Sequence, residues 1–277
     1  MTRKTLLITG CSSGIGYDAA HALAARGWRV FATARKPEDV ARLTGEGLES
    51  LHLDHTDAET IDSALAEITA RTGGRLDAVF ANGAYGLAAA VEDLPTEALR
   101  EIFETNVFGI HELTRQVIPL MRAQGHGRIV VNSSILGFTA LRWRAAYVAT
   151  KFALEGYADT LRVELAGTGI HVSLIQPGPI ATEFRRNSQP HFERWIDWRN
   201  SALRSDYEAI VLPRLYDESG RRDPFELPPA AVTKTLVHAL EARRPRPRYP
   251  VTFPTRAAAL LKRLLPARIT DRIVARF

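Results

Sequence analysis

Cysteine is nearly absent from this chain of 277 residues, which contains only Cys11. A single cysteine excludes an internal disulfide and every metal site built from several thiolates. The eight histidines do not replace them, because His52 and His55, three positions apart, fall at a strand end where solvated surface histidines are the simpler interpretation. We therefore expect no metal site.

Long apolar runs are missing as well. No run approaches the roughly 18 residues that span a bilayer, and no signal peptide is visible. The chain begins with Met-Thr-Arg-Lys-Thr and continues directly into Leu6-Leu7-Ile8, which is typical of a first strand. Apolar residues make up 45% and charged residues 24%, as in a globular protein and unlike a disordered chain. A cytoplasmic location is the expectation.

The positive charge of the chain is unevenly distributed. The net charge is +5, but the segment from Arg243 to Phe277 carries ten basic residues and one acid, Asp271. The remainder is slightly acidic, so the excess positive charge belongs to the C-terminal tail. No nucleic-acid-binding motif accompanies it, and we expect no nucleic-acid partner.

Short apolar runs alternate with helical patterns over the first two thirds of the chain. The predicted strands are Thr5–Thr9, Arg29–Thr33, Leu48–Leu53, Leu76–Ala81, Arg128–Asn132 and His171–Ile175. The predicted helices are Ile15–Arg26, Pro37–Leu43, Ala58–Arg71, Thr96–Arg122 and Ala145–Leu165. This order predicts a single α/β domain over residues 1–277, with a doubly wound parallel sheet covered by helices on both faces.

Residues 183–227 interrupt this rhythm. They show no clear period but contain seven aromatic residues, and an aromatic-rich loop normally covers something apolar. We interpret this segment as a substrate-binding lid. The candidate substrate contacts are Phe184, Trp195, Trp198 and, from outside the segment, Trp143. The alternative is that these aromatics only pack the lid onto the body of the protein.

Residues 254–277 close the chain as two short, basic amphipathic helices. Their last helix has a basic stripe beside an apolar one, formed by Arg268, Arg272 and Arg276 and by Ile269, Ile273 and Phe277. Such a helix can lie on an anionic membrane surface. Because it is short for a lone anchor, packing against its own domain or a partner subunit is favoured.

The first predicted strand leads through a glycine-rich turn into a helix. The turn reads Thr9-Gly10-Cys11-Ser12-Ser13-Gly14-Ile15-Gly16. Glycines let the backbone approach a pyrophosphate, and the helix N-terminus offers unpaired N–H groups and a positive dipole end. A plain tight turn is the alternative. The candidate cofactor contacts in this turn are Gly10, Ser12, Ser13, Gly14, Ile15 and Gly16.

Tyr147 and Lys151 stand four residues apart on one predicted helix. Side chains at this spacing share a face, and an ammonium stabilises the ionised form of a nearby phenol, so tyrosine can act as an acid or base. Thirteen residues before Tyr147, Ser134 follows a strand at the carboxyl edge of the predicted sheet. Asn106 lies inside a long predicted helix, where a buried amide is locally unfavourable and indicates a special role.

With these residues and Pro177-Gly178, the chain resembles the short-chain dehydrogenase/reductase family over about residues 3–184, and more weakly beyond. The resemblance implies a Rossmann-type fold. It also implies that Tyr147 exchanges a proton with the substrate oxygen and that Ser134 holds that oxygen.

The same resemblance gives two more residues catalytic roles. Lys151 would lower the pKa of Tyr147 and bind the nicotinamide ribose together with it, while Asn106 would hold a water of a proton relay. Ser133 is a rival for the role of Ser134, but the thirteen-residue offset favours Ser134.

Further cofactor contacts follow from the resemblance. Asp54 is similar to an adenine-contacting acid of the family, with a helix cap as the alternative. Where the family usually has Asn-Asn-Ala-Gly, this chain has Ala81-Asn82-Gly83-Ala84, and the small residues still let the backbone approach the adenosine ribose. The remaining candidates, expected beside the nicotinamide, are Pro177, Gly178, Ile180 and Thr182.

The end of the second predicted strand bears on the choice of cofactor. An acid there would accept a bond from the ribose 2′-hydroxyl of NAD, but this chain has Arg35-Lys36. Two cations suit a 2′-phosphate, so NADP is favoured over NAD. A solvated charge pair is the alternative.

We therefore predict an oxidoreductase that uses NADP(H) to interconvert a carbonyl and an alcohol on a bulky, apolar small molecule. The alternatives are an NAD-dependent alcohol dehydrogenase of the same family and a dinucleotide-binding regulatory protein with little turnover. The C-terminal layout loosely resembles bacterial relatives of the steroid and retinol dehydrogenases. The family commonly forms a homodimer or homotetramer through its two long helices.

Overall fold

The centre of the molecule is a parallel sheet of seven strands in the order β3-β2-β1-β4-β5-β6-β7. The computed structural model describes residues 3–275. The strands are β1 Thr5–Ile8, β2 Arg29–Ala34, β3 Glu49–His52, β4 Ala78–Ala81, β5 Gly127–Asn132, β6 Ile170–Gln176 and β7 Arg248–Pro250. The strand order reverses between β1 and β4, and sheets of this kind bind ligands at the carboxyl ends beside such a point.

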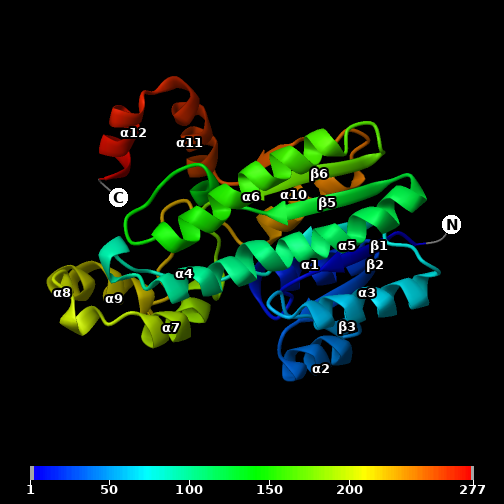
Figure 1. Cartoon of the computed structure of the whole chain (residues 1–277), viewed down its shortest axis with the longest axis horizontal. Helices are drawn as coiled ribbons and strands as arrows, with labels where there is room; N and C mark the ends of the chain where they lie inside the picture. Colours follow the sequence, from blue (N-terminus) through cyan, green and yellow to red (C-terminus); the bar gives the residue numbers. More distant parts are fainter. Residues whose placement is uncertain (1–2, 276–277) are drawn as a thin grey trace.

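Helices cover both faces of the sheet (Figure 1). The helices of the body are α1 Gly14–Ala25, α2 Pro37–Gly45, α3 Ala58–Thr72, α4 Thr96–Phe103, α5 Gly109–Gln124, α6 Ala145–Glu164 and α10 Ala230–Glu241. One buried apolar cluster joins α1, α2 and α10 to the sheet, and a second joins α3, α5 and α6 to it. The prediction of a doubly wound α/β domain is confirmed.

The long helix predicted over Thr96–Arg122 is divided by one turn of π-helix. This turn, Glu104–Phe108, lies between α4 and α5 and contains Asn106. π-Helical turns occur frequently at functional sites. The sequence pattern did not reveal the turn, because one extra residue hardly changes the apolar period on either side.

Strand β7 was also missed from the sequence. It is a three-residue edge strand, Arg-Tyr-Pro, that pairs with β6 only. The prolines around it predicted a break in structure, yet an edge strand tolerates proline because one side of its backbone forms no ladder.

The lid segment, residues 183–227, is helical over most of its length. It contains α7 Phe184–Trp195, α8 Arg204–Asp206 and α9 Leu212–Leu215, together with a short 3₁₀ turn and a second π turn. Buried side chains at helical spacing, Tyr207, Val211 and Leu215, join a third apolar cluster. The expectation of an aperiodic loop is therefore wrong. α8 and α9 are too brief to show a period, and α7 is mostly polar and contains Pro190.

The C-terminal helices α11 Phe253–Leu264 and α12 Ala267–Val274 extend away from the sheet (Figure 1). No residue of α12 is buried, and Ile269 and Ile273 remain 43% and 38% exposed. Arg276 and Phe277, the last members of the two predicted stripes, lie outside the described residues. Within residues 3–275, no helix has both the length and the apolar character needed to cross a membrane.

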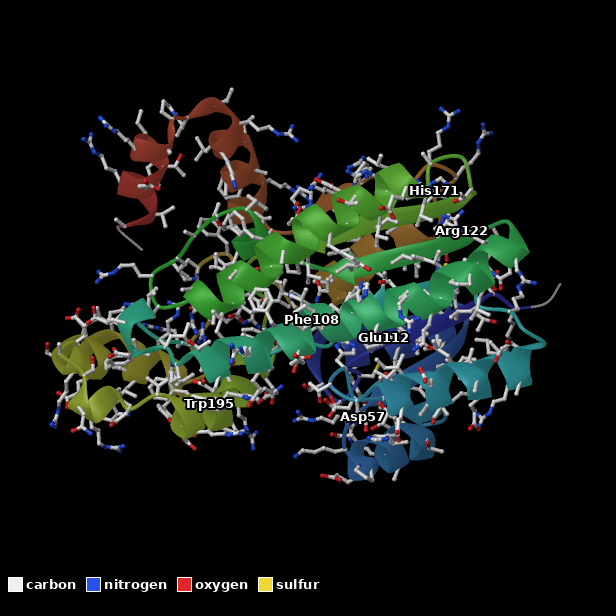
Figure 2. The ribbon with its side chains drawn as sticks, in the orientation of Figure 1. Asp57, Phe108, Glu112, Arg122, His171 and Trp195 are labelled. Carbon is white, nitrogen blue, oxygen red and sulfur yellow. The ribbon has the colours of Figure 1, made fainter. Side chains whose placement is uncertain are left out.

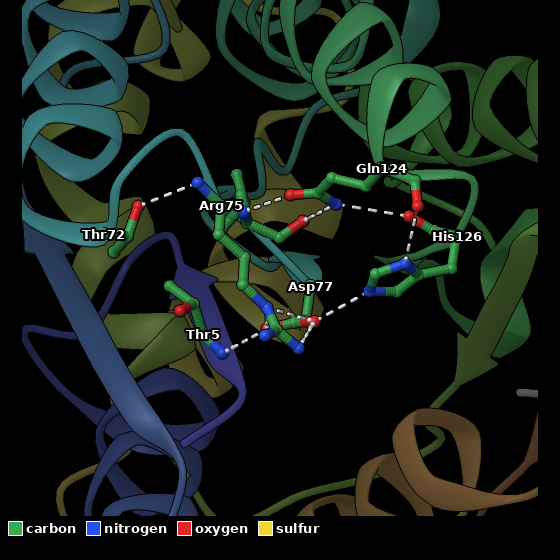
Figure 3. A network of polar contacts seen from close by, with 7 residues as sticks. Thr5, Thr72, Arg75, Asp77, Gln124 and His126 are labelled. Atoms are coloured by element: carbon green, nitrogen blue, oxygen red, sulfur yellow. Dashed lines mark hydrogen bonds and ion pairs between the residues drawn. The ribbon is translucent and has the colours of Figure 1, made fainter. Parts of the chain in front are cut away.

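A polar network joins the amino ends of the strands, opposite the candidate site (Figure 3). Asp77 accepts hydrogen bonds from the backbone N–H of Thr5 at 2.7 Å and from Arg75, and it contacts Nε2 of His126 at 2.9 Å. These partners hold the pKa of Asp77 below its usual range, although burial acts in the opposite direction. This end of the sheet is thus tied together, whereas the carboxyl ends open into a cavity.

Candidate active site

The glycine-rich turn after β1 forms one wall of a cavity of about 1090 Å³. Gly10 and Gly14 have φ values of 69° and 59°, which favour glycine. A Cβ at Gly16 would lie 2.2 Å from the carbonyl oxygen of Gly10, so this position excludes any side chain. Ser13 begins α1 without a side-chain cap, so the N-terminus of α1 retains its capacity to bind an anion.

These features fit the diphosphate of a dinucleotide. The cavity wall includes Gly10, Ser12, Ser13, Gly14, Ile15, Asn82, Gly83, Pro177, Gly178, Ile180 and Thr182, all predicted cofactor contacts. Thr182 lies directly over the turn, because a Cβ at Gly14 would be 3.0 Å from its Cγ2. Thr182 also accepts the N–H of Phe184, the first residue of α7, at 3.4 Å, so it contacts both the turn and the start of this helix.

Asn82 connects the turn to the neighbouring strands. Its Nδ2 donates to the carbonyl oxygens of Thr9 and Gly10 at 3.0 and 3.2 Å. Its Oδ1 accepts from Asn132 at 2.8 Å, and the carbonyl oxygen of Asn132 accepts from Lys151 Nζ at 2.7 Å. This chain of hydrogen bonds joins the ends of β1, β4 and β5 to α6. The chain has Gly83-Ala84 where the family usually has Ala-Gly, and this change leaves the hydrogen bonds of Asn82 intact.

Ser134, Tyr147 and Lys151 meet in the same cavity. Lys151 Nζ lies 5.4 Å from the centroid of the Tyr147 ring, and the lysine is only 1% exposed. The side chain of Ser134 is close enough to Tyr147 for a hydrogen bond that lowers the pKa of the phenol. The sequence thus brings the three polar groups together from two elements, the end of β5 and the first turns of α6.

Burial is the largest influence on the pKa values of Tyr147 and Lys151. It raises the pKa of Tyr147, with Ser134 and the positive charge of Arg144 acting in the opposite direction. It lowers the pKa of Lys151 to about 7, against an opposing effect of Glu155. The main groups that lower the pKa of Tyr147 here are therefore Ser134 and Arg144, whereas the sequence pointed to Lys151.

Ser133, the alternative to Ser134, forms its side-chain hydrogen bond with a residue other than Tyr147. Its hydroxyl donates to Glu155 Oε1 at 2.6 Å, and the same carboxylate receives Gln176 at 2.9 Å and Arg248 at 2.8 Å. This geometry favours Ser134 as the serine that faces Tyr147. Glu155 was not predicted as a site residue, although its position four residues after Lys151 places both on one helix face.

Asn106 is fully buried but does not line the cavity. Its Oδ1 accepts the N–H of Tyr85 at 3.1 Å, while its Nδ2 donates to the carbonyl oxygen of Tyr85 at 2.9 Å and to Thr150 Oγ1 at 3.2 Å. The side chain therefore ties the π turn to α6 and to the segment after β4.

Four predicted cofactor contacts lie outside the cavity wall, namely Gly16 of the turn, Arg35, Lys36 and Asp54. Arg35 and Lys36 are exposed at the carboxyl end of β2. Within residues 3–275, Arg35 forms no ion pair, and Lys36 reaches Glu38 at 3.9 Å. Asp54 accepts two hydrogen bonds from Thr56, both at 2.9 Å, while Asp57 caps α3.

Of the predicted substrate contacts, the cavity wall includes Ser134 and Phe184. The Phe184 ring meets the Tyr147 ring edge-on, with centroids 5.3 Å apart. Trp143, Trp195 and Trp198 instead pack against the third apolar cluster. Trp195, labelled in Figure 2, donates to Glu101 of α4 at 3.2 Å. These tryptophans attach the lid segment to the body, which is the alternative that the sequence left open.

A family model described as short chain dehydrogenase matches residues 4–192. The chain belongs to the short-chain dehydrogenase/reductase family. This dehydrogenase is thus a nicotinamide-dependent oxidoreductase with a Rossmann-type fold.

Curated relatives of this dehydrogenase cover most of its length. An uncharacterized oxidoreductase, YbbO of Escherichia coli, is 38% identical over 273 residues, covering 98% of this chain and 94% of YbbO. Human 17-beta-hydroxysteroid dehydrogenase type 1 is 31% identical over 262 residues, or 90% of this chain and 77% of that protein. Human retinol dehydrogenase 8 is 37% identical over 65% of this chain and 60% of its own length.

Solved structures of other proteins share the fold of this dehydrogenase over nearly the whole chain. A short-chain dehydrogenase from Streptomyces avermitilis has a TM-score of 0.78 at 28% identity, with 99% of this chain and 98% of that chain covered. Two Burkholderia proteins, each 22% identical, share the fold. The one from Burkholderia phymatum, in complex with NAD, has a TM-score of 0.78, with 99% and 95% covered. The one from Burkholderia cenocepacia, in complex with NADP, has a TM-score of 0.75, with 98% and 97% covered.

Proposed function

We propose that this dehydrogenase uses NADPH to reduce the carbonyl group of an aldehyde or ketone, with Tyr147 as the proton donor. The observation that carries the proposal is the shared cavity. Ser134, Tyr147 and Lys151 line it together with the glycine-rich turn. A substrate in this space lies between the polar groups and the cofactor site.

The proton step follows from the burial of Tyr147. Burial raises the pKa of the phenol, so at neutral pH it is protonated and acts as an acid. Ser134 donates a hydrogen bond to the carbonyl oxygen and holds it beside Tyr147. The bound cofactor supplies the hydride that the carbonyl carbon gains, and the oxygen takes the phenolic proton to give an alcohol.

The preference for NADPH rests on Arg35. Its guanidinium is exposed at the carboxyl end of β2 without an ion pair inside residues 3–275. β2 pairs with β1, which leads into the glycine-rich turn. A guanidinium is the better partner for a 2′-phosphate, and this end of β2 carries no acid to accept the 2′-hydroxyl of NAD.

The lining of the cavity also includes the apolar side chains of Leu141, Phe184 and Leu215. These side chains favour a substrate with a hydrocarbon or aromatic body. Leu141 and Leu215 were not predicted as substrate contacts, because neither belongs to a motif in the sequence.

We also propose a homodimer or homotetramer that forms through α5 and α6. Phe108, the residue before α5, and Phe152, on α6, are 50% and 40% exposed, and exposed aromatics often belong to interfaces. Phe108 and the neighbouring Glu112 are labelled in Figure 2. Light scattering of the purified protein gives the mass that tests this proposal.

The function is tested by following NADPH consumption with a panel of aldehydes and ketones. We expect turnover with apolar carbonyl compounds and slower turnover with NADH. A protein that binds NADPH but reduces no member of a broad panel would favour the regulatory alternative.

A further inference from the structure

Two arginines on the wall of the active-site cavity form no ion pair within residues 3–275, the exposed Arg221 and the more buried Arg144. Arg144 lines the cavity with Tyr147 and Phe184, and its side chain is partly buried. Within residues 3–275, no carboxylate forms an ion pair with Arg144. Its neighbour Arg142, by contrast, points to Asp206 at 3.9 Å and lies outside the cavity wall. A cation removed from water without a partner is costly.

The backbone holds Arg144 at this place. Arg144 precedes α6, and its carbonyl oxygen accepts the N–H of Val148 at 2.8 Å. It also forms an isolated bridge with Ala89. Trp143 has a φ of 64°, unusual for a bulky residue, and its carbonyl oxygen accepts the N–H of Ala89 at 3.0 Å. These contacts impose a costly conformation beside Arg144, as is common where a functional side chain must be positioned.

Other charges on the wall do not neutralise Arg144. Arg185 and Arg214 share one carboxylate, Asp223. Burial and the positive charges of Arg214 and Arg185 lower the pKa of Arg144 to about 10, and the group that opposes them is Tyr147. The surroundings of its guanidinium therefore favour the arrival of a negative charge.

Three of the remaining wall carboxylates have other neighbours. Glu183 reaches Arg186 at 3.6 Å. Asp217 accepts the N–H of Ser219 at 3.0 Å, and Glu226 accepts that of Asp223 at 3.3 Å. Neither these three nor Glu218, the last wall carboxylate, forms an ion pair with Arg144 within residues 3–275.

We propose that Arg144 binds a carboxylate of the substrate, so that the preferred substrates are oxo acids with an apolar body. The inference rests on the carbonyl reduction proposed above. A guanidinium offers a fork of donors that matches a carboxylate. Since Arg144 comes one helical turn before Tyr147, the bound carboxylate lies near the carbonyl that Tyr147 protonates. Leu141 and Leu215 face the remaining hydrocarbon.

The first experiment compares kinetics on an oxo acid and on its neutral amide. Charged hydrogen bonds contribute about 1.5–3 kcal/mol, which corresponds to roughly a tenfold to hundredfold effect. We expect Arg144→Gln to lower kcat/KM for the acid by that factor more than it lowers kcat/KM for the amide, because losing the charge near Tyr147 affects both substrates alike. Arg142→Gln is the matched control and should change neither. Equal losses on both substrates would overturn the proposal.

The second experiment needs no turnover. Benzoate and benzamide share a shape and differ in charge, and calorimetry measures the affinity of each for the NADPH-bound protein. We expect wild type to bind benzoate at least about tenfold more tightly, and Arg144→Gln to lose this difference. If wild type binds both equally, the carboxylate subsite is refuted. If benzoate is preferred but no carbonyl compound is reduced, the subsite stands and the proposed function fails.

Discussion

The side chains with the proposed chemical roles lie where their charged forms are costly. Lys151 Nζ lies 5.4 Å from the centroid of the Tyr147 ring. Burial raises the pKa of Tyr147 and lowers that of Lys151. The spacing of the two residues predicted their shared helix face, which the structure has. The spacing could not predict that burial affects the two pKa values more than the charge interaction between the side chains does. The extent of burial depends on how α7 and the strand ends pack around them.

The first prediction concerns the pH dependence of stability in the cofactor-free protein. Burial lowers the pKa of Lys151 from 10.5 to about 7. Between these values the unfolded chain holds a proton that the folded chain has released, so a rise in pH stabilises the folded state. Lys151→Met removes this contribution. From about pH 7 to 10, the free energy of unfolding of wild type should gain on the variant by up to about 1.4 kcal/mol per pH unit.

Urea unfolding at several pH values measures this difference. The variant also loses the hydrogen bond from Lys151 to the Asn132 carbonyl oxygen. This loss lowers the free energy of unfolding by a constant amount and does not change its dependence on pH. Lys36→Met, at an exposed lysine, is the control and should keep the wild-type pH dependence. Parallel curves for wild type and Lys151→Met would contradict the prediction.

The second prediction concerns the exposed cation at the end of β2. Arg35→Asp should reverse the cofactor preference, because it removes a partner of the 2′-phosphate and adds a carboxylate that repels it and accepts the 2′-hydroxyl. Titration of wild type and variant with NADPH and NADH measures both affinities. If wild type already binds NADH more tightly, the proposed role of Arg35 is wrong.

At the scale of elements, the junction of α4 and α5 joins three parts of the site. Its π turn presents Asn106 to the segment after β4 and to Thr150 of α6. The sequence marked Asn106 as unusual, since a polar residue inside an apolar helical pattern needs a partner. It did not identify the partner, because Tyr85 contributes only backbone atoms, and these carry no sequence signal.

The third prediction follows from this junction. Asn106→Ala leaves the backbone N–H and C=O of Tyr85 without their partner. An unsatisfied buried group costs about 1–3 kcal/mol, so we expect the free energy of unfolding to fall by about 2–4 kcal/mol. Asn200→Ala is the matched control, because that exposed amide bonds only to Asp197 in the described part of the chain, and it should cost less than about 0.5 kcal/mol. A loss below about 1 kcal/mol for Asn106→Ala would contradict this account of the junction.

At the scale of the whole molecule, the tied amino ends of the sheet contrast with the open carboxyl ends. The alternation of strands and helices predicted this arrangement, since both faces of every central strand are buried. The cover over the carboxyl ends was harder to predict. Helices α8 and α9 are short, α7 is mostly polar, and the packing of this segment depends on tertiary contacts of Phe192 and Tyr207. Local sequence does not reveal such contacts.

The fourth prediction concerns limited proteolysis of the lid segment. Residues 217–226 form no helix or strand, and Arg221 and Arg222 are exposed there. Trypsin should cut this stretch first within the lid segment, while Arg194 of α7 resists. Because Arg221 lines the cavity, NADPH with a carbonyl compound should slow the cut. Mass spectrometry of a time course identifies the sites, and early cleavage at Arg194 would show that α7 is not stably packed.

The central claim is that Tyr147 donates the proton in a cavity shared with the cofactor. Substitution by phenylalanine tests it most directly, because the ring and its edge contact with Phe184 remain while the proton is lost. A general acid contributes about 10²–10⁴-fold. Tyr147→Phe should therefore lower kcat for carbonyl reduction by that factor while the Kd for NADPH changes less than about threefold. A variant that keeps the wild-type kcat would contradict the account.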